Sequence, residues 1–325
     1  MTTIAIIGAG MAGLTCATRL AKSGHAVTVF DKGRGPGGRM AARRAEIAGE
    51  TVSFDHGAQF FTARDPAFVD QVKEWEADGV VARWKAAEKG EGDPAWVGTP
   101  GMNGPIRAMA EPLGVRWAVR VETIDWVEEQ DAWKLTDENG GSLGEYDVVI
   151  CAVPAEQAAV LLSDPARAFA RAAREVVSEP CWAVMAAFDA PLAIESDCIR
   201  SPENAISWAA RNSAKPARAG AENWVLHASP AKTREILDMP KEEAAPHLLA
   251  CFFEEAGIAP VTPIHAVAHR WLYAMPASAK GDPCLWDPDF MIGACGDYLH
   301  SPRVKGAFLS GLALADRVLE TLKPS

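Results

Sequence analysis

The chain has 325 residues, of which 49% are apolar and 23% charged, and its formal net charge is −11 at pH 7. This composition is typical of a globular protein and excludes a disordered chain, while the acidic balance argues against a nucleic-acid binder, which needs a basic face. The longest apolar runs are strand-sized, so no membrane span is expected. The N-terminus lacks the basic region and cleavage site of a signal peptide, and we therefore expect a cytoplasmic protein.

The first 31 residues follow the order strand, glycine turn, helix, strand, acidic residue. Thr3–Ile7 is an uncharged apolar run, typical of a buried parallel strand. Gly8–Gly13 is a complete G-x-G-x-x-G turn, and apolar residues recur at helical spacing after it. A second apolar strand then ends at Asp31.

This order predicts a bound dinucleotide. In such a turn the first glycine permits the tight bend, the second lets the backbone approach a pyrophosphate, and the third lets helix and strand pack closely. The helix N-terminus offers free N–H groups to phosphates, and Asp31 can accept hydrogen bonds from a ribose. The pattern leaves open whether the dinucleotide is FAD or NAD.

Two further stretches near the N-terminus suggest the same cofactor. Residues 33–38 form a second glycine-rich loop, which a simple nucleotide fold does not need, and Arg39 after it could reach a pyrophosphate or a ring. Farther on, Gly57 and Ala58 are small enough for the backbone to touch a planar ring. The carboxamide of Gln59 can both donate and accept hydrogen bonds.

The rest of the chain predicts one more buried strand and a separate antiparallel sheet. Residues 146–153 read as a parallel-type strand that returns to the first sheet, and residues 139–141 mark a hairpin turn before it. Strands that mostly alternate in hydrophobicity follow in the middle third, which favours a sheet with one covered face. These strands are expected at residues 182–189, 205–210, 223–228 and 265–275, and the helices at 66 onward, 106–113, 155–162, 165–177, 241–256 and 304–322. Residues between the helix at 66 and Trp96 are expected to be irregular, and 115–127 to be one strand.

The C-terminal part again suggests cofactor binding. A short strand over 291–297 ends in Gly-Asp, and a carboxylate such as Asp297 at the C-terminal end of a strand can hold a polyol hydroxyl. The helix that follows carries Gly306 and Ala307 in its first turn, small enough to bring its N-terminus close to a ligand.

Together these stretches resemble the FAD-dependent amine-oxidase superfamily over nearly the whole chain. One dinucleotide fingerprint with a terminal Gly-Asp and helix is typical of FAD, whereas a pyridine-nucleotide reductase would show a second G-x-G-x-x-G. The resemblance implies an α/β protein with a Rossmann-like FAD-binding domain and a second, mainly antiparallel β-sheet substrate domain. The FAD-binding domain is expected over residues 1–70, 105–160 and 285–325, and the substrate domain over 71–104 and 161–284.

The resemblance also implies the cofactor-binding residues. Residues of the glycine turn would hold the diphosphate, Asp31 the adenosine ribose, Val121 the adenine and Asp297 the ribityl chain. The helix that begins near Gly306 would direct its positive end at the flavin. The expected set is Gly8, Gly10, Met11, Ala12, Asp31, Lys32, Arg39, Met40, Asp55, His56, Gln59, Val121, Asp297, Gly306 and Ala307. We expect FAD to be held non-covalently.

Within the superfamily the chain resembles the renalases, especially the bacterial ones. The resemblance is carried by residues 7–13, Asp31-Lys32, 37–40 and 57–60. It implies hydride transfer from 2- and 6-dihydro-NAD(P) to flavin N5, with reoxidation by O2 that releases NAD(P)+ and H2O2. Superfamily amine oxidases usually carry a lysine on the strand that faces flavin N5, and the matching strand, 179–186, has none.

The substrate side is expected to be poor in bases. A dihydronicotinamide becomes an aromatic cation by losing hydride alone, so no acid–base residue is nominated. Trp271 and Tyr273 fall on one face of a strand and suit stacking on a flat ring, or are ordinary core. The pocket candidates are Gln59, Phe60, Asn103, Trp271 and Tyr273, and Arg64, Arg211 or Arg270 could meet a substrate pyrophosphate.

Several alternatives stay open from the sequence. The chain could be an amine oxidase, a desaturase of apolar chains, or a flavin-binding protein without turnover. The choice between NAD and NADP, and between a monomer and a homodimer, is also open. The seven cysteines contain no C-x-x-C pair, so we expect reduced thiols with no metal and no disulfide framework.

Overall fold

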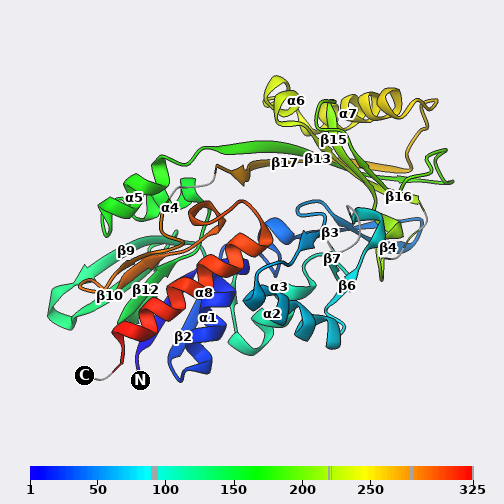
Figure 1. Ribbon diagram of the computed structural model, residues 1–325. Helices are drawn as coiled ribbons and strands as arrows, with labels where there is room; N and C mark the ends of the chain where they lie inside the picture. Colours follow the sequence, from blue (N-terminus) through cyan, green and yellow to red (C-terminus); the bar gives the residue numbers. More distant parts are fainter. Residues whose placement is uncertain (89–93, 219, 221, 278–280, 324–325) are drawn as a thin grey trace. The chain divides into compact units, whose positions relative to one another are not determined.

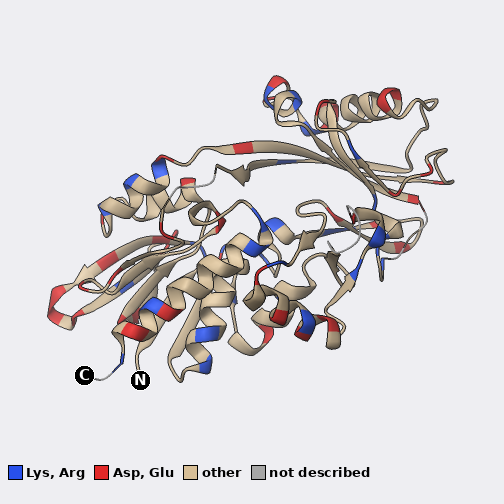
Figure 2. Cartoon of the chain, viewed as in Figure 1, with Lys and Arg blue, Asp and Glu red and all other residues tan. Residues whose placement is uncertain are grey.

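The computed structural model describes residues 1–88, 94–218, 220, 222–277 and 281–323, and the chain divides into two compact units. Unit 1 comprises Met1–Gly38, Ile106–Val177 and Pro276–Ser325, and unit 2 comprises Arg39–Pro105 and Ser178–Met275. Figure 1 shows the elements of both units. Acidic and basic residues are interspersed along the chain of each unit (Figure 2).

Unit 1 is built on a six-stranded sheet in the order β18-β19-β12-β1-β2-β8. All neighbours pair in parallel except β18 and β19. The central strands are short apolar runs with almost no exposed side chain, as a sheet covered on both faces requires. The strands are β1 (Thr3–Ile7), β2 (Ala26–Asp31), β8 (Arg116–Trp117), β12 (Val148–Cys151), β18 (Leu285–Asp287) and β19 (Ile292–Ala294).

Helices and a small antiparallel sheet complete unit 1. Helix α1 (Met11–Lys22) packs along α8 (Val304–Thr321). Ala5 and Ile7 of β1 join a core with β9 and β10 residues, while Ile4 and Ile6 alternate to the opposite face. The remaining elements are β9 (Val121–Val127), β10 (Ala132–Asp137), β11 (Ser142–Tyr146), α4 (Ala155–Leu161), α5 (Arg167–Arg174), η3 (Glu111–Leu113), η4 (Glu128–Gln130) and η6 (Asp297–Leu299).

Unit 2 is built on a five-stranded sheet in the order β14-β15-β16-β13-β17. Alternate residues of β13 face opposite layers: Val184 and Ala186 pack in the core that α7 covers, and Met185 and Ala187 pack against a hairpin. The sheet strands are β13 (Ser178–Phe188), β14 (Cys198–Arg200), β15 (Ile206–Arg211), β16 (Glu222–Ala228) and β17 (His265–Pro276), and the helices are α2 (Pro66–Ala77), α6 (Pro230–Glu235) and α7 (Lys241–Ala256).

Short strands and turns fill the rest of unit 2. The hairpin pairs β3 (Ala42–Ile47) with β4 (Glu50–Asp55). A three-stranded sheet orders β5 (Phe61–Thr62), β7 (Ala95–Gly98) and β6 (Val81–Arg83). The short helices η2 (Lys85–Ala87) and η5 (Asn212–Ala214) also lie here. Two of the four chain boundaries between the units fall within η1 (Gly38–Met40) and α3 (Gly104–Ala110).

The α/β fold class is confirmed, and the structure corrects three details of the sequence-based assignment. Residues 81–83 and 95–98 are strands, where irregular chain was expected. The hairpin β3–β4 was not foreseen. The expected single strand over 115–127 is broken at Ala118, whose φ of 57° lies in the left-handed region.

The functional division of the chain stays a prediction, but the compact units divide it elsewhere. Residues 39–70 were expected with the FAD-binding part and belong to unit 2, because Val52 and Phe54 of the hairpin pack on Met185 and Val225. Residues 161–177 belong to unit 1, where α5 packs in its core. Among the described residues no helix has the length and apolarity that a bilayer span requires.

Candidate functional site

The glycine turn of unit 1 leaves one side of the backbone bare. Gly8 has a φ of 110°, and a Cβ there would lie 2.5 Å from the carbonyl oxygen of Ala152. A Cβ on Gly13 would lie 1.9 Å from the oxygen of Gly8, so this glycine lets helix and turn close on each other. A Cβ on Gly10 would instead meet nothing within 4 Å. Helix α1 has no side-chain cap, so its N-terminal N–H groups fit a phosphate approaching Gly10.

Asp31 ties the end of β2 to this turn. Its carboxylate accepts hydrogen bonds from the N–H of Ala9 at 2.7 Å and of Gly33 at 2.7 Å. Each oxygen keeps a lone pair for a ribose hydroxyl. Lys32 donates to Oε1 of Gln157 at 2.8 Å, and partial burial, with Arg120 nearby, lowers the pKa of its ammonium.

Of the other unit 1 candidates, Val121, Asp297 and Gly306 are buried and Ala307 is half-buried. Val121 is the first residue of β9 and packs in the core, and Asp297 begins η6 directly after β19. The small residues of α8 have packing roles. A Cβ on Gly311 would lie 2.1 Å from the oxygen of Ala12, and a Cβ on Gly306 would lie 2.0 Å from the oxygen of Ser301. Apart from Arg39, which belongs to unit 2, unit 1 contains the candidates for the adenosine, the diphosphate and the ribityl chain.

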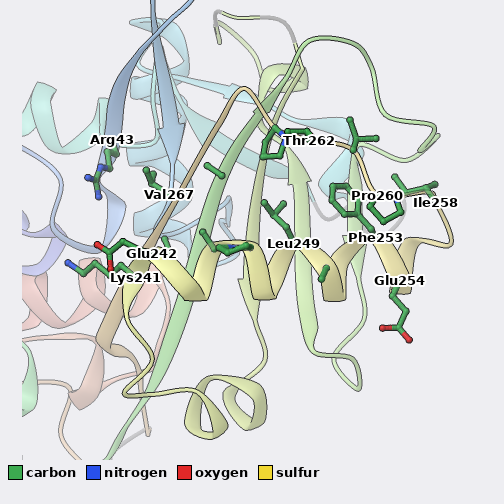
Figure 3. Close-up of a pocket in the computed structure, with 17 residues that line it drawn as sticks. Arg43, Lys241, Glu242, Leu249, Phe253, Glu254, Ile258, Pro260, Thr262 and Val267 are labelled. Atoms are coloured by element: carbon green, nitrogen blue, oxygen red, sulfur yellow. The ribbon is translucent and has the colours of Figure 1, made fainter.

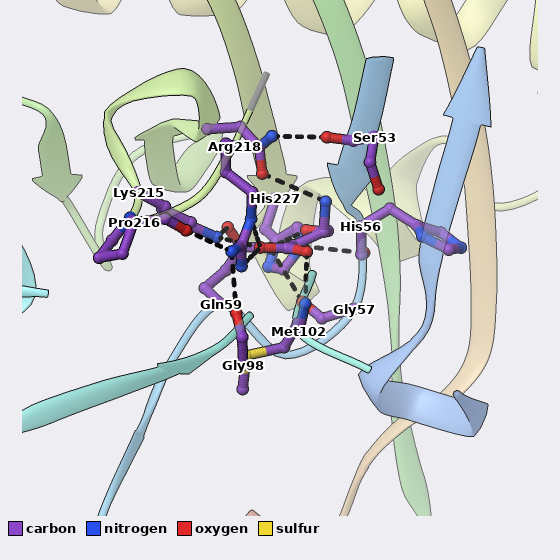
Figure 4. Close-up of polar contacts among 12 residues, drawn as sticks. Ser53, His56, Gly57, Gln59, Gly98, Met102, Lys215, Pro216, Arg218 and His227 are labelled. Carbon is purple, nitrogen blue, oxygen red and sulfur yellow. Dashed lines mark hydrogen bonds and ion pairs between the residues drawn. The ribbon is translucent and has the colours of Figure 1, made fainter. Parts of the chain in front are cut away.

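Most of the candidates for the flavin ring lie in unit 2, where Asp55 is held by Lys215, Arg218 and Met102, three residues that Figure 4 labels. The side chains of Asp55, Lys215 and Arg218 have no exposed surface. Arg218 donates to Asp55 Oδ2 from Nη2 at 2.6 Å and from Nε at 3.2 Å, and Lys215 donates at 3.2 Å. The N–H of Met102 donates to Oδ1 at 2.8 Å.

This network keeps Asp55 ionised. Burial raises the pKa of Asp55, but Lys215, Arg218 and the Met102 N–H together bring that pKa below its ordinary value. Burial lowers the pKa of Lys215 to about 8. The carboxylate is bound to these internal partners, and its expected part in cofactor binding stays a prediction.

Gln59 has no uncommitted polar atom. Its Nε2 donates to the carbonyls of Asp55 and, at 3.0 Å, Gly57, and its Oε1 accepts from Lys215 at 3.0 Å. A Cβ on Gly57 would lie 2.1 Å from the oxygen of Arg39, and the N–H of Ala58 donates to that same oxygen at 2.8 Å. The turn at residues 57–59 is therefore fixed against the backbone of Arg39.

Three neutral histidines and Trp271 form an aromatic cluster beside this turn. His56 stacks on Trp271 with ring centroids 5.0 Å apart, and His269 meets Trp271 edge-on at 4.4 Å. The carbonyl of His56 accepts from Trp271 Nε1 at 2.9 Å and lies 3.2 Å from Nε2 of His227. Burial lowers the pKa of each histidine to about 4, so all three rings are uncharged at neutral pH.

The remaining pocket candidates also lie in unit 2. Phe60 stacks on Trp208 at 5.3 Å, with the Arg200 guanidinium 5.1 Å from its ring. Asn103 and Tyr273 are half-buried. The structure thus places every substrate-side candidate in one unit, and their contact with a ligand remains a prediction.

The arginines expected to meet a pyrophosphate are largely committed. Arg211 pairs with Asp197 and, at 3.2 Å, with Glu222, and Arg270 donates to the carbonyl of Leu237. Arg64 also has a partner. By contrast, two cations that the sequence did not single out, Arg43 and Lys241, have no ion-pair partner among the described residues.

These two cations line the larger of two described pockets in unit 2 (Figure 3). Its volume is about 670 Å³, and apolar side chains of α7 and of residues 258–263 form most of its wall. Arg43 and Lys241 lie toward one end, beside Glu242. Arg43 also lines a second pocket of about 260 Å³ with His265.

The cysteines are free thiols. Burial raises the pKa of Cys151 and of Cys181 to about 12, and the pKa values of Cys284 and Cys295 are also raised by burial. Protonated thiols are poor nucleophiles. Non-covalent binding of FAD stays a prediction.

Sequence reasoning missed Lys215, Arg218 and His227. Lys215 and Arg218 lie in a loop after β15 whose composition does not indicate that it is buried. His227 lies in an otherwise apolar strand. One general rule could have indicated them. A buried charge is normally paired with an opposite charge, so a buried Asp55 requires a cation, but the sequence does not show which one.

Two family models match the chain, one near the N-terminus and one over most of the remainder. A family model described as NAD(P)-binding Rossmann-like domain matches residues 6–75, and one described as flavin containing amine oxidoreductase matches residues 79–319. The fold also matches a solved putrescine oxidase variant with a TM-score of 0.71 at 15% identity, covering 98% of this chain and 99% of that one. A wild-type putrescine oxidase bound to putrescine gives a TM-score of 0.68 at 14% identity and the same coverage.

Curated relatives match only in part. A tRNA 5-methylaminomethyl-2-thiouridine biosynthesis bifunctional protein MnmC of Albidiferax ferrireducens is 26% identical over 162 residues, 46% of this chain and 26% of that protein. A 4,4'-diapophytoene desaturase of Staphylococcus aureus (strain Newman) is 57% identical over 54 residues, 17% of this chain and 10% of that protein.

Proposed function

The chain belongs to the family of flavin-containing amine oxidoreductases and is a flavin-dependent oxidoreductase, and from this premise we propose that it oxidises the 2- and 6-dihydro isomers of NAD(P), as the renalases do. A bound flavin would accept the hydride at N5 and return two electrons and that hydrogen, as a proton, to O2; with a second proton from solvent the products are NAD(P)+ and H2O2. We propose FAD, held non-covalently, with the adenosine and diphosphate on the unit 1 candidates and the ring on Arg39, Met40, His56 and the turn at Gln59.

The observation that carries this proposal is the absence of an uncommitted base among the substrate-side candidates. Asp55 is the only carboxylate in the candidate set of unit 2, and it is ion-paired inside the unit. His56 and His269 are held neutral around Trp271, and their lowered pKa makes them weak bases. A site of stacked rings without a base suits a substrate that loses hydride and no proton.

One observation favours amine oxidation as a second candidate. Strand β13 carries no lysine, but Lys215 is buried beside Gln59, and a lysine whose pKa is about 8 is largely neutral above that pH, where it could take up a proton from an amine. Anaerobic mixing separates the two functions. We expect 2- or 6-dihydro-NAD to bleach the bound flavin rapidly and benzylamine-type amines to leave it oxidised. Bleaching by amines alone would establish the second function, and bleaching by neither would leave only flavin binding.

We further propose that Arg43 and Lys241 hold the substrate's pyrophosphate. Arg43 is close enough to His56 and His269 to contribute to the lowering of their pKa values, and Lys241 acts on His269 in the same way. Both cations therefore lie near the rings that stack with Trp271, and neither has an acidic partner among the described residues.

Replacing Arg43 by glutamine is expected to raise KM for the dinucleotide about tenfold, the lower end of what a hydrogen bond between charged groups contributes. A phosphate-free dihydronicotinamide should react unchanged, because it lacks the group that Arg43 binds. Steady-state kinetics with both substrates measure this. Arg171→Gln in α5 of unit 1 removes the same charge from an exposed position and serves as the control. Equal effects of the two variants would exclude a specific role for Arg43.

A further inference from the structure

Lys215 is a buried cation that the fold does not need. The side chains of Asp55, Lys215 and Arg218 are all without exposed surface, and they bring two positive charges to one carboxylate. Arg218 by itself satisfies Asp55 Oδ2 with two N–H groups, and the Met102 N–H satisfies Oδ1. Arg218 also donates to the carbonyls of Gly98 and Pro216. The charges of Asp55 and Arg218 therefore balance each other, and both carboxylate oxygens accept hydrogen bonds without Lys215.

No other described group neutralises the second cation. The groups that act on the Lys215 ammonium are Asp55, Arg218 and the Cys198 thiol, which burial keeps protonated. His227 also faces Lys215, and it is uncharged at neutral pH. The ring of Trp84 lies 5.2 Å from the ammonium and offers only a cation–π contact. Burying an uncompensated charge costs several kcal/mol, so an apolar side chain of the same length would suit the fold as well or better.

The contacts of Lys215 lead to the turn proposed to face the flavin. Its ammonium donates to Gln59 Oε1 at 3.0 Å. This contact orients the carboxamide so that Nε2 points at the carbonyls of Asp55 and Gly57. The two carbonyl groups are thereby hydrogen-bonded within unit 2. The positive charge lies one side chain away from the turn at residues 57–59 (Figure 4).

We propose that Lys215 is a positioning residue of the flavin reaction: through Gln59 it fixes the turn at residues 57–59, and its unneutralised charge favours the electron-rich, reduced state of a flavin bound against that turn. The proposal rests on the proposed function in requiring a flavin bound against this turn. It does not depend on which substrate reduces that flavin.

The first test is stability. Lys215→Met removes the charge and keeps the length of the side chain. Because the loss of the hydrogen bonds to Gln59 and Asp55 is offset by the removal of a buried charge, the urea midpoint should stay close to that of the wild-type protein at pH 7. The wild-type protein should also gain stability between about pH 8 and 10.5, where the unfolded lysine keeps a proton that the folded one has released, and the variant should not. A loss of stability as large as that of Asp55→Asn would assign Lys215 to the fold and overturn the proposal.

The second test is the midpoint potential of the flavin, measured in the holoprotein by equilibration with a reference dye. We expect Lys215→Met to shift the reduction equilibrium about tenfold toward the oxidised form at pH 7, which is about 30 mV for a two-electron couple. The wild-type potential should be the higher one because Lys215 is protonated below about pH 8. The difference in potential between wild-type and Lys215→Met protein should be full below that pH and vanish well above it. Lys215→Arg keeps the charge at every pH and should retain the higher potential in alkali.

The outcomes separate this proposal from the proposed function. Equal potentials for wild-type and Lys215→Met protein at pH 7, or a difference that does not change with pH, would overturn the role of Lys215. If the flavin is reduced in the dye assay but by no dihydronicotinamide isomer, the proposed substrate is wrong while the potential measurement stands. If anaerobic reduction by substrate is also followed, we expect its rate constant to fall about tenfold in Lys215→Met, less than the roughly 100-fold or more lost when a donor contacting the reacting atom is removed.

Discussion

Asp55→Asn is expected to lower the free energy of unfolding by about 3–5 kcal/mol, the usual effect of removing one partner from a buried ion pair. Asparagine has nearly the same shape and can still accept from the Met102 N–H. It leaves Lys215 and Arg218, both without exposed surface, with no counter-charge. Urea unfolding followed by tryptophan fluorescence measures the change, because several tryptophans are buried in unit 2.

The pH dependence of this loss has a definite sign. In the folded protein the pKa of Asp55 lies below its ordinary value, so the carboxylate stabilises the fold above that ordinary value and ceases to do so as the pH falls through the folded pKa. The gap between wild-type and Asp55→Asn protein should therefore be full at pH 7 and shrink below about pH 4. A gap of equal size at low pH would show that the loss comes from shape and not from charge.

A double variant supplies the matched control. Asp55→Asn with Lys215→Met leaves one buried cation in place of two, so it should be more stable than Asp55→Asn alone. The two effects should not add, because the residues share one network. Additive losses would contradict the view that Lys215 is an excess charge.

Gly10→Ala is expected to weaken FAD binding without harming the protein. Gly10 has a φ of −83°, which alanine adopts freely, and its Cβ would meet no protein atom within 4 Å. If the diphosphate lies against this glycine, the added methyl occupies its place. Overpacking of this kind costs about 1–3 kcal/mol, or roughly 5- to 150-fold in affinity. The flavin released into the supernatant when the protein is precipitated with acid measures the content, and titration of apoprotein with FAD measures Kd.

Gly13→Ala provides the contrast. Its Cβ would lie 1.9 Å from the oxygen of Gly8, so the backbone must shift, and we expect lower thermal stability together with lost FAD. Gly10→Ala should unfold at the temperature of the wild-type apoprotein. Unchanged FAD affinity in Gly10→Ala would place the diphosphate elsewhere, and yellow colour left in the precipitate would show a covalent flavin.

The sequence alone predicted the features that depend on neighbours along the chain. The turn at Gly8–Gly13, the buried strands around it and the helix over 241–256 follow from glycine placement and hydrophobic period, which act over a few residues. The small strands at 81–83 and 95–98 were missed because strands this short show little alternation of apolar and polar residues. They are stabilised by pairing with each other. The hairpin at 42–55 was missed for a related reason: its β3 strand, with Arg43, Arg44 and Glu46, is only partly buried.

The sequence by itself determined that this chain carries a dinucleotide fingerprint, a second glycine loop and an acidic residue after a late strand, since each is a local pattern with a local physical reason. Only the tertiary structure decided which charges meet. Asp55 and Lys215 are 160 residues apart, and nothing in either segment indicates the other. The tertiary structure also decided the role of Gln59. Its carboxamide was expected to contact a ligand, but both polar atoms are hydrogen-bonded to Lys215 and to two backbone carbonyls. Local patterns fix turns and periods, whereas the pairing of buried charges depends on contacts that exist only after the chain has folded.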